Sequence, residues 1–379
     1  MKTTAKWALA LLVLAGGSFY AGYEWRNFAV MLGALAFFLT AVSLLVKPAR
    51  TALTVLVSVC VALGLAELGL DMLPFNARSV HFSPSDKPYW SRSDLGATPI
   101  PGRHTTRKFD PDGKVIYDAT YTIGDDGFRV TPGQPATFSQ RVNFLGDSVT
   151  FGEGLNDDQT LVAQVQRLLP GVMLKNFGMH GYGMHQALAI LQSPRDTSGQ
   201  VNFVLTFPGH AERSACLPAF SMGSPRYVMQ ADGKLQRSGV CGGISYYPLA
   251  RVLSLSKVYG LVKTALHGNK RQIDDDFKLY LALLRDIVKL SASRNQTVVV
   301  GFLRDQDDYF ASSSYSNQQI VDAIKALNVQ VIDLTLADKS ENVDPKYVLS
   351  RYDPHPSAAG DALRGPMVAD VLRKALASK

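Results

Sequence analysis

Hydrophobic residues are concentrated in three uncharged stretches near the start of the chain. They cover residues 7–23, 28–46 and 51–66. Each is close to the length of about 17–25 residues that a helix needs to cross a bilayer. A signal peptide could explain the first stretch, but not the two behind it. A buried helical hairpin is the alternative, but the stretches are apolar on every side. The pattern therefore predicts a three-helix transmembrane anchor within residues 1–73.

Basic residues beside these stretches predict their orientation. Lys2 and Lys6 precede the first span, and Lys47 and Arg50 lie between the second and third. The loop between the first and second spans carries one charge of each sign. The positive-inside rule places the N-terminus and the second loop in the cytoplasm. We therefore expect a bacterial inner-membrane protein whose main domain lies in the periplasm.

The next part of the chain, residues 74–140, is rich in Pro, Gly, Ser and charged residues. Its strand-like runs surround the turn sequences "PDGK" and "GDDG". This composition predicts a β-rich connector that packs on the main domain.

From residue 141 onward, short apolar runs alternate with helical patterns. The expected strands are 141–145, 172–177, 201–207, 297–303 and 329–334. The expected helices are roughly 156–169, 184–193, 274–294, 316–327 and 357–376. This alternation predicts an α/β domain over 141–379, with a parallel sheet covered by helices on both faces. A long insertion, 211–270, follows the third strand, and we expect it to roof the active site.

The net charge of +7 narrows the choice of partners. The basic residues are scattered, with no run of five or more. Nucleic-acid binding usually shows a clustered basic footprint. We therefore expect no nucleic acid, and we interpret the charge as a mild preference for anionic surfaces or glycans.

The three cysteines fall into two groups. Cys60 lies in the third span, and we expect it to be a small core residue. Cys216 and Cys241 lie on the exported side, where disulfides persist, and they flank two extended pieces around the turn "ADGK". We predict a disulfide between them, with two unpaired thiols as the alternative. The spacings typical of zinc ligands are missing, so no metal or other cofactor is expected.

Candidate chemistry lies at two points of the main domain. Ser148 follows the first strand, where Gly146 permits a sharp turn, and ligands of such sheets bind beyond the strand ends. A serine hydroxyl is a weak nucleophile unless a base takes its proton. "DPHP", after the last strand, supplies Asp353 and His355 two residues apart. In an extended loop both can lie on one face, so Asp353 can hold His355 toward Ser148. The sequence predicts a catalytic triad.

Three segments resemble a known family. "FLGDSVTFGEG" (144–154), "NFGMHGYGMHQ" (176–186) and "DPHP" (353–356) are similar to the first, second and final blocks of the SGNH/GDSL hydrolases. Val149 replaces the usual leucine of the first block. The resemblance covers about residues 141–376 and implies a flavodoxin-like α/β/α sandwich. It also implies Ser148 as nucleophile, and an oxyanion hole made by the backbone N–H groups of Ser148 and Gly181.

The chain departs from the family pattern in two places. The third block normally carries an asparagine that donates to the oxyanion, but here "PGHAER" places His210 there. A histidine N–H could donate in the same way. Alternatively, His210 is a loop residue and the hole uses only Ser148 and Gly181. The final block reads DxH instead of DxxH, so either Asp353 or a backbone carbonyl orients His355.

Several neighbouring polar residues have weaker assignments. We expect Asp147 to fix the turn before Ser148. We expect His180 and His185 at the rim of the pocket. Glu153 and Arg213 are candidates for substrate contact.

These features together predict a membrane-anchored periplasmic serine esterase. It would remove O-acyl groups, chiefly acetyl, from a cell-envelope or extracellular polysaccharide. The first alternative is an O-acyltransferase acting on such a glycan, which would require a multi-spanning partner to bring the acyl group across the membrane. The second is a non-catalytic glycan-binding or assembly protein with a decayed SGNH fold. The insertion lacks the long apolar stripe that a lipase would need.

Overall fold

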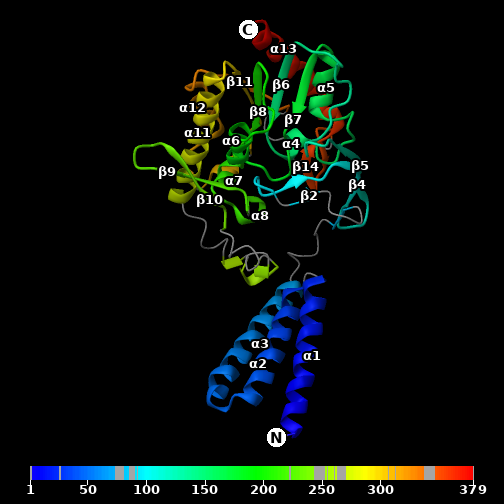
Figure 1. Ribbon diagram of the computed structural model, residues 1–379, viewed down its shortest axis with the longest axis vertical. Coiled ribbons are helices and arrows are strands. Elements are labelled where there is room, and N and C mark those ends of the chain that lie inside the picture. The colour runs from blue at the N-terminus through cyan, green and yellow to red at the C-terminus, as the bar shows by residue number, and fades with distance from the viewer. Residues whose placement is uncertain are drawn as a thin grey trace. The chain divides into compact units, whose positions relative to one another are not determined.

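The chain forms two compact units in the computed structural model (Figure 1). One contains residues 1–79 and 245–267, and the other contains 80–244 and 268–379. The structure describes residues 2–24, 27–72, 81–84, 90–91, 93–221, 223–242, 252–253, 255–259, 261–262, 270–305, 307–311, 313–336 and 346–378.

The first unit contains three long apolar helices, as predicted. They are α1 (Lys2–Glu24), α2 (Phe28–Leu45) and α3 (Arg50–Met72), with the short turn η1 (Lys47–Ala49) before α3. Large apolar side chains such as Trp7 and Leu65 project outward and are about two-thirds exposed. Water would penalise such a surface, whereas lipid would not. Three segments, Thr4–Gly22, Phe28–Leu45 and Lys47–Leu70, are long and apolar enough to cross a membrane.

A buried carboxylate in α3 binds part of the predicted insertion. Glu67 accepts hydrogen bonds from the backbone N–H of Lys257 at 2.8 Å, from that of Val258 at 3.1 Å, and from the Ser256 hydroxyl. Residues 245–267 accordingly group with the helical unit. Two backbone N–H groups and one hydroxyl of the insertion are thus bound by α3, and the expectation that the insertion roofs the active site stays a prediction.

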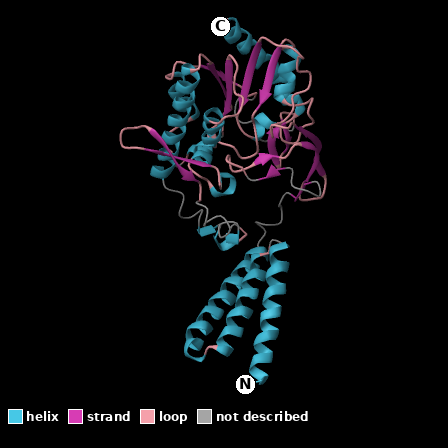
Figure 2. Ribbon diagram, in the orientation of Figure 1, coloured by secondary structure: helices cyan, strands magenta, loops and turns pink. Residues whose placement is uncertain are grey.

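The second unit is built on a five-stranded parallel sheet (Figure 2). Its order, β12-β11-β8-β6-β7, is the flavodoxin-like arrangement in which the first strand along the chain lies between the second and the third. The strands are β6 (Gln140–Leu145), β7 (Val172–Asn176), β8 (Val201–Thr206), β11 (Thr297–Phe302) and β12 (Gln330–Asp333).

Helices cover both faces of this sheet, which confirms the predicted three-layer sandwich. One face packs against α5 (Leu161–Leu168) and α13 (Ala358–Ala377). The other packs against α6 (Met184–Gln192), α11 (Lys270–Ser293) and α12 (Asn317–Lys325).

The central strand β8 shows why the sheet strands read as continuous apolar runs. All of its residues are buried, with Val204 in the core on one face and Phe203 and Leu205 in the core on the other. A strand buried on both faces cannot alternate between apolar and polar residues. The helix predicted at residues 156–169 is α5, and it begins later than expected, at Leu161. The Thr160 hydroxyl accepts a hydrogen bond from the N–H of Ala163 and caps the helix there.

The predicted connector contains an antiparallel sheet that packs on the α/β unit. It pairs β1 (His81–Pro84), β4 (Gly102–Phe109) and β5 (Val115–Ile123), and the short pair β2 (Trp90–Ser91) and β3 (Thr98–Pro99) lies between β1 and β4 in sequence. Alternate residues of β5 enter the core shared with α6 and α11. They are Tyr117, Ala119, Tyr121 and Ile123.

The predicted disulfide is present after β8. Cys216 and Cys241 are bonded, with their Cα atoms 5.3 Å apart. The chain between them contains α8 (Pro218–Ser221) and the antiparallel pair β9 (Pro225–Met229) and β10 (Leu235–Val240). Three candidate spans and a disulfide together indicate membrane anchoring with the α/β unit outside the cytoplasm.

Candidate active site

The turn after β6 places Ser148 at the carboxyl edge of the sheet. A Cβ on Gly146 would lie 2.1 Å from Thr150 Oγ1 and 3.0 Å from the Leu205 carbonyl oxygen, so only glycine fits there. Asp147 then caps the short helix α4 (Ser148–Phe151), because its Oδ1 accepts the N–H of Val149 at 3.0 Å. Ser148 therefore stands beside the point where the strand order reverses, the usual ligand site of this fold.

The structure brings Ser148, His355 and Asp353 into one hydrogen-bonded line. His355 Nε2 lies 2.8 Å from Ser148 Oγ, and His355 Nδ1 lies 2.5 Å from Asp353 Oδ1. Instead of a loop, Asp353–Pro356 forms a short strand, β14, which pairs with β13 (Val348–Ser350). Residues two apart on a strand point to the same side, which explains how the DxH spacing suffices. This geometry can support nucleophile, base and orienting acid.

Charge around the histidine opposes the effect of its burial. Burial alone would lower the pKa of His355, but the carboxylates of Glu153, Asp353 and Asp147 outweigh it and raise the pKa above the usual value. For the carboxyl of Asp353, burial acts in the other direction and would raise the pKa. The contacts with His355 and then Lys108 outweigh this effect and lower the pKa of Asp353. Asp353 is therefore ionised at neutral pH, and its charge favours the protonated form of the imidazole.

A lysine from the connector binds the second oxygen of the Asp353 carboxylate. Lys108 on β4 donates from Nζ to Asp353 Oδ2 at 2.8 Å, which leaves Oδ1 for His355. Sequence reasoning missed Lys108, which is 245 residues from its partner. The contact depends on the strand register, which places Lys108 opposite Tyr117 in the β4–β5 pair, on the face that packs inward.

Replacing Lys108 with methionine is expected to lower kcat/KM for an ester substrate by about tenfold, the value of a charge-assisted hydrogen bond. Asp353 would lose one of its two partners and hold His355 less firmly. The uncompensated carboxylate should also move the acid limb of the pH–rate profile upward. The matched control is Lys114→Met, at the exposed turn of the same hairpin. Equal rates in both variants would mean that Lys108 does not support Asp353.

The loop after β7 holds the predicted oxyanion glycine. Gly181 has a φ of +73°, in the region that favours glycine, and a Cβ there would lie 3.0 Å from the Phe220 ring. Asn176 ties this loop to the nucleophile turn: its Oδ1 accepts the N–H of Gly178, and its Nδ2 donates to the Thr150 carbonyl, both at 2.9 Å. The donation of the Gly181 N–H to an oxyanion stays a prediction.

His210 lies at the start of α7 (His210–Ser214), fully buried beside the carboxylate of Asp147. Its Nδ1 lies 2.9 Å from Thr206 Oγ1, and its Nε2 lies 3.5 Å from Asp147 Oδ2. Arg213 Nη1 donates to the same Asp147 oxygen at 2.6 Å. Burial acts to raise the pKa of Asp147, but these two neighbours lower it far below its usual value. Donation from His210 to an oxyanion is also still a prediction.

His180 and His185, both predicted to lie at the rim of the pocket, have different environments. His185 is fully buried, with Nε2 2.9 Å from Ser224 Oγ, so its expected place at the rim is wrong. It lies on α6, which packs into the core of the domain. His180 is half-buried, and its Nδ1 lies 2.5 Å from Glu153 Oε2.

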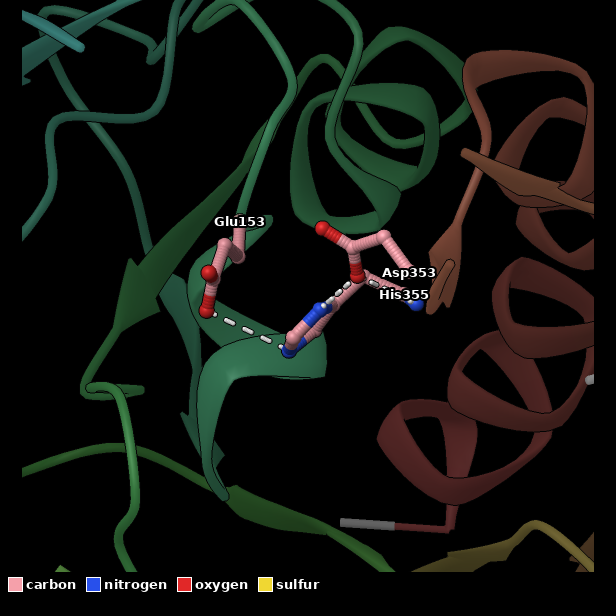
Figure 3. A group of neighbouring side chains, drawn as sticks. All are labelled: Glu153, Asp353 and His355. Carbon is pink, nitrogen blue, oxygen red and sulfur yellow. Dashed lines mark hydrogen bonds and ion pairs between the residues drawn. The ribbon is translucent and has the colours of Figure 1, made fainter. Parts of the chain in front are cut away.

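Glu153 also reaches the triad, as Figure 3 shows. One donor atom each of Glu153, Asp353 and His355 lie within 4.8 Å of one another, a spacing that could hold a cation. However, both ring nitrogens of His355 lie at hydrogen-bond distance from Asp353 and Ser148. His355 is therefore already in contact with Ser148 and Asp353, and Glu153 adds a second carboxylate beside it.

Comparisons with known proteins found similarity only among solved structures, since no protein-family model and no curated protein matches the sequence. A member of the lipolytic protein G-D-S-L family from Veillonella parvula is 14% identical over 62% of this chain and 98% of its own, with a TM-score of 0.34. The psychrotrophic esterase EstA from Pseudoalteromonas is 12% identical over 63% and 98%, with a TM-score of 0.33. A carbohydrate esterase is 12% identical over 78% and 86%, with a TM-score of 0.36. Because these TM-scores lie below 0.5, the fold and the site rest on the geometry of the chain itself.

Proposed function

We propose that this chain is a serine ester hydrolase of the SGNH/GDSL type. The observation that carries the proposal is the hydrogen-bonded line from Ser148 through His355 to Asp353 at the switch point of a flavodoxin-like sheet. A serine, a histidine and an aspartate in this order are what acyl transfer requires.

The reaction follows from the positions of these atoms. His355 Nε2 takes the Ser148 proton as Oγ attacks the acyl carbonyl, and the backbone N–H groups of Ser148 and Gly181 are the proposed donors to the oxyanion. The C–O bond to the alcohol breaks, and the alcohol oxygen takes the proton from Nε2. Water then attacks the acyl-enzyme with His355 again as base, and the free acid leaves as Ser148 is restored.

The setting favours a polymeric substrate outside the cytoplasm. The basic residues around the spans support an N-terminus in the cytoplasm of a bacterial cell and a catalytic domain in the periplasm. A tethered enzyme with a net positive charge is suited to an acylated polysaccharide of the envelope or the cell surface. We propose acetyl groups as its main target.

The test uses the full chain reconstituted in nanodiscs with an acetylated polysaccharide. Acetate release, together with labelling of Ser148 by a fluorophosphonate, is the expected result. Transfer of acetyl from p-nitrophenyl acetate to an oligosaccharide, with little free acetate, would favour the O-acyltransferase. Neither labelling nor release would leave the non-catalytic glycan-binding protein as the remaining hypothesis.

A further inference from the structure

A second carboxylate faces the catalytic histidine, and the triad does not use it. Glu153 Oε2 lies 3.2 Å from His355 Nε2, the ring nitrogen that also faces Ser148 Oγ. The same oxygen lies 2.5 Å from His180 Nδ1. In Figure 3, Glu153 and Asp353 reach the two different nitrogens of the His355 ring. The imidazole is thus bracketed by two acids.

The position of Glu153 is fixed by its neighbours. It lies between Gly152 and Gly154, whose φ angles of +84° and +77° favour glycine. A Cβ on Gly154 would lie 2.3 Å from the Leu349 side chain, so the backbone passes through a tight space. The His180 ring packs on Phe151, with 4.5 Å between ring centroids. Glu153 is therefore built into the site, and its side chain is only 14% exposed.

We propose that Glu153 is a positioning residue of the catalytic site: held by His180, it accepts the Nε2–H of His355 in each tetrahedral intermediate, while the imidazole is protonated. This inference rests on the proposed esterase function and adds a residue to its machinery.

The need for such an acceptor follows from the reaction. When the Ser148 proton moves to Nε2 and Oγ bonds to the acyl carbon, Oγ becomes part of the tetrahedral intermediate and a weaker acceptor than a free hydroxyl. The new Nε2–H then faces Glu153, which keeps the imidazolium in place until the leaving alcohol oxygen takes the proton. The same sequence recurs with the proton of the attacking water. Glu153 stays ionised throughout and forms no covalent bond.

The charges around His355 agree with this role. Three carboxylates face it: Asp353 from β14, Glu153 from the loop after α4, and Asp147 from the start of α4. Lys108 lies against Asp353, and Arg213 lies against Asp147. Glu153 forms ion pairs with His180 and His355, the charge of Lys108 also acts on it, and its own charge acts to raise the pKa of His355. Despite burial, His180 and His355 lower the pKa of Glu153 well below the usual range.

The test is the pH dependence of Glu153→Gln in the full chain. Removing this charge should shift the acid limb of kcat/KM for p-nitrophenyl acetate down by about one pH unit, the least that a close opposite charge contributes. The pKa of His355, followed by NMR of the ¹³C-labelled ring, should fall equally. The control Asp118→Asn, an exposed acid of β5, should leave both values unchanged.

A second variant and the NMR titration of His355 complete the test. If Glu153→Gln does not fold, Glu153→Asp withdraws the carboxylate by one methylene and should shift the limb part of the way. An unchanged limb and an unchanged His355 titration in the folded variant would overturn the inference. If the native chain hydrolyses no ester, the proposed function fails, but the NMR titration still decides whether Glu153 holds the imidazole.

Discussion

Replacement of Ser148 by alanine is expected to abolish ester hydrolysis, with kcat/KM falling by about 10³-fold or more. Ser148 is the only hydroxyl among the described residues that lies at hydrogen-bond distance from His355 Nε2. Without Oγ no acyl-enzyme forms, and only the weak reaction of water remains. The loss should appear in acetate release and in fluorophosphonate labelling.

The folded state should survive this change. Asp147 still caps α4 through the Val149 N–H, and the deletion removes a single oxygen from a buried turn. Thermal unfolding of the variant should therefore stay close to that of the native chain. Ser293→Ala, an exposed serine at the end of α11, is the matched control and should retain full activity. Hydrolysis by Ser148→Ala at the native rate would show that the triad is not the catalytic centre.

Local patterns were sufficient to predict the sheet and the two ends of the triad. Each sheet strand is a continuous apolar run, because both faces are covered, and helices intervene in regular order. Gly146 and Ser148 lie in one short segment, and Asp353 and His355 lie in another. The chemistry of each segment is therefore visible without knowledge of the tertiary structure.

Contacts between distant segments could not be predicted in this way. Lys108 reaches Asp353 only through the register of a hairpin against the domain. Glu153 and His180 meet because the loops after β6 and β7 leave neighbouring parallel strands. The burial of His185 depends on which side of α6 faces the core, and a helix of mostly apolar residues does not reveal that side.

The largest expected loss of stability comes from Arg129, whose side chain is almost fully buried. Its Nη1 donates to the carbonyls of Phe151 and Gly152 at 2.9 and 2.7 Å. Its Nη2 donates to the Leu155 carbonyl at 2.6 Å, and its Nε to Asp157 at 3.0 Å. One guanidinium thus satisfies the polar groups of the loop that follows the nucleophile.

Arg129→Met is expected to lower the free energy of unfolding by about 3–5 kcal/mol, although methionine fills much of the same volume. The carbonyl oxygens of Phe151, Gly152 and Leu155 would lose this buried donor, as would the more distant Thr120 carbonyl, and the partly exposed Asp157 would lose its charged partner. The stability of Arg129→Lys should lie between those of the native chain and Arg129→Met, because an ammonium group cannot direct its donors to the same set of acceptors as a planar guanidinium. The shift in thermal unfolding of the full chain, followed by circular dichroism, measures the effect.

A comparison with an exposed arginine tests whether burial causes the loss of stability expected for Arg129→Met. Arg107 on β4 pairs with Asp118 at 2.7 Å, but both side chains are about half exposed, so Arg107→Met should cost less than about 1 kcal/mol. Arg129 also fixes the loop that carries Glu153, and its loss should reduce ester hydrolysis even where the chain remains folded. If the two methionine variants were equally stable, the hydrogen bonds of Arg129 would contribute no more than a surface ion pair, and the loop after Ser148 would hold its shape without them.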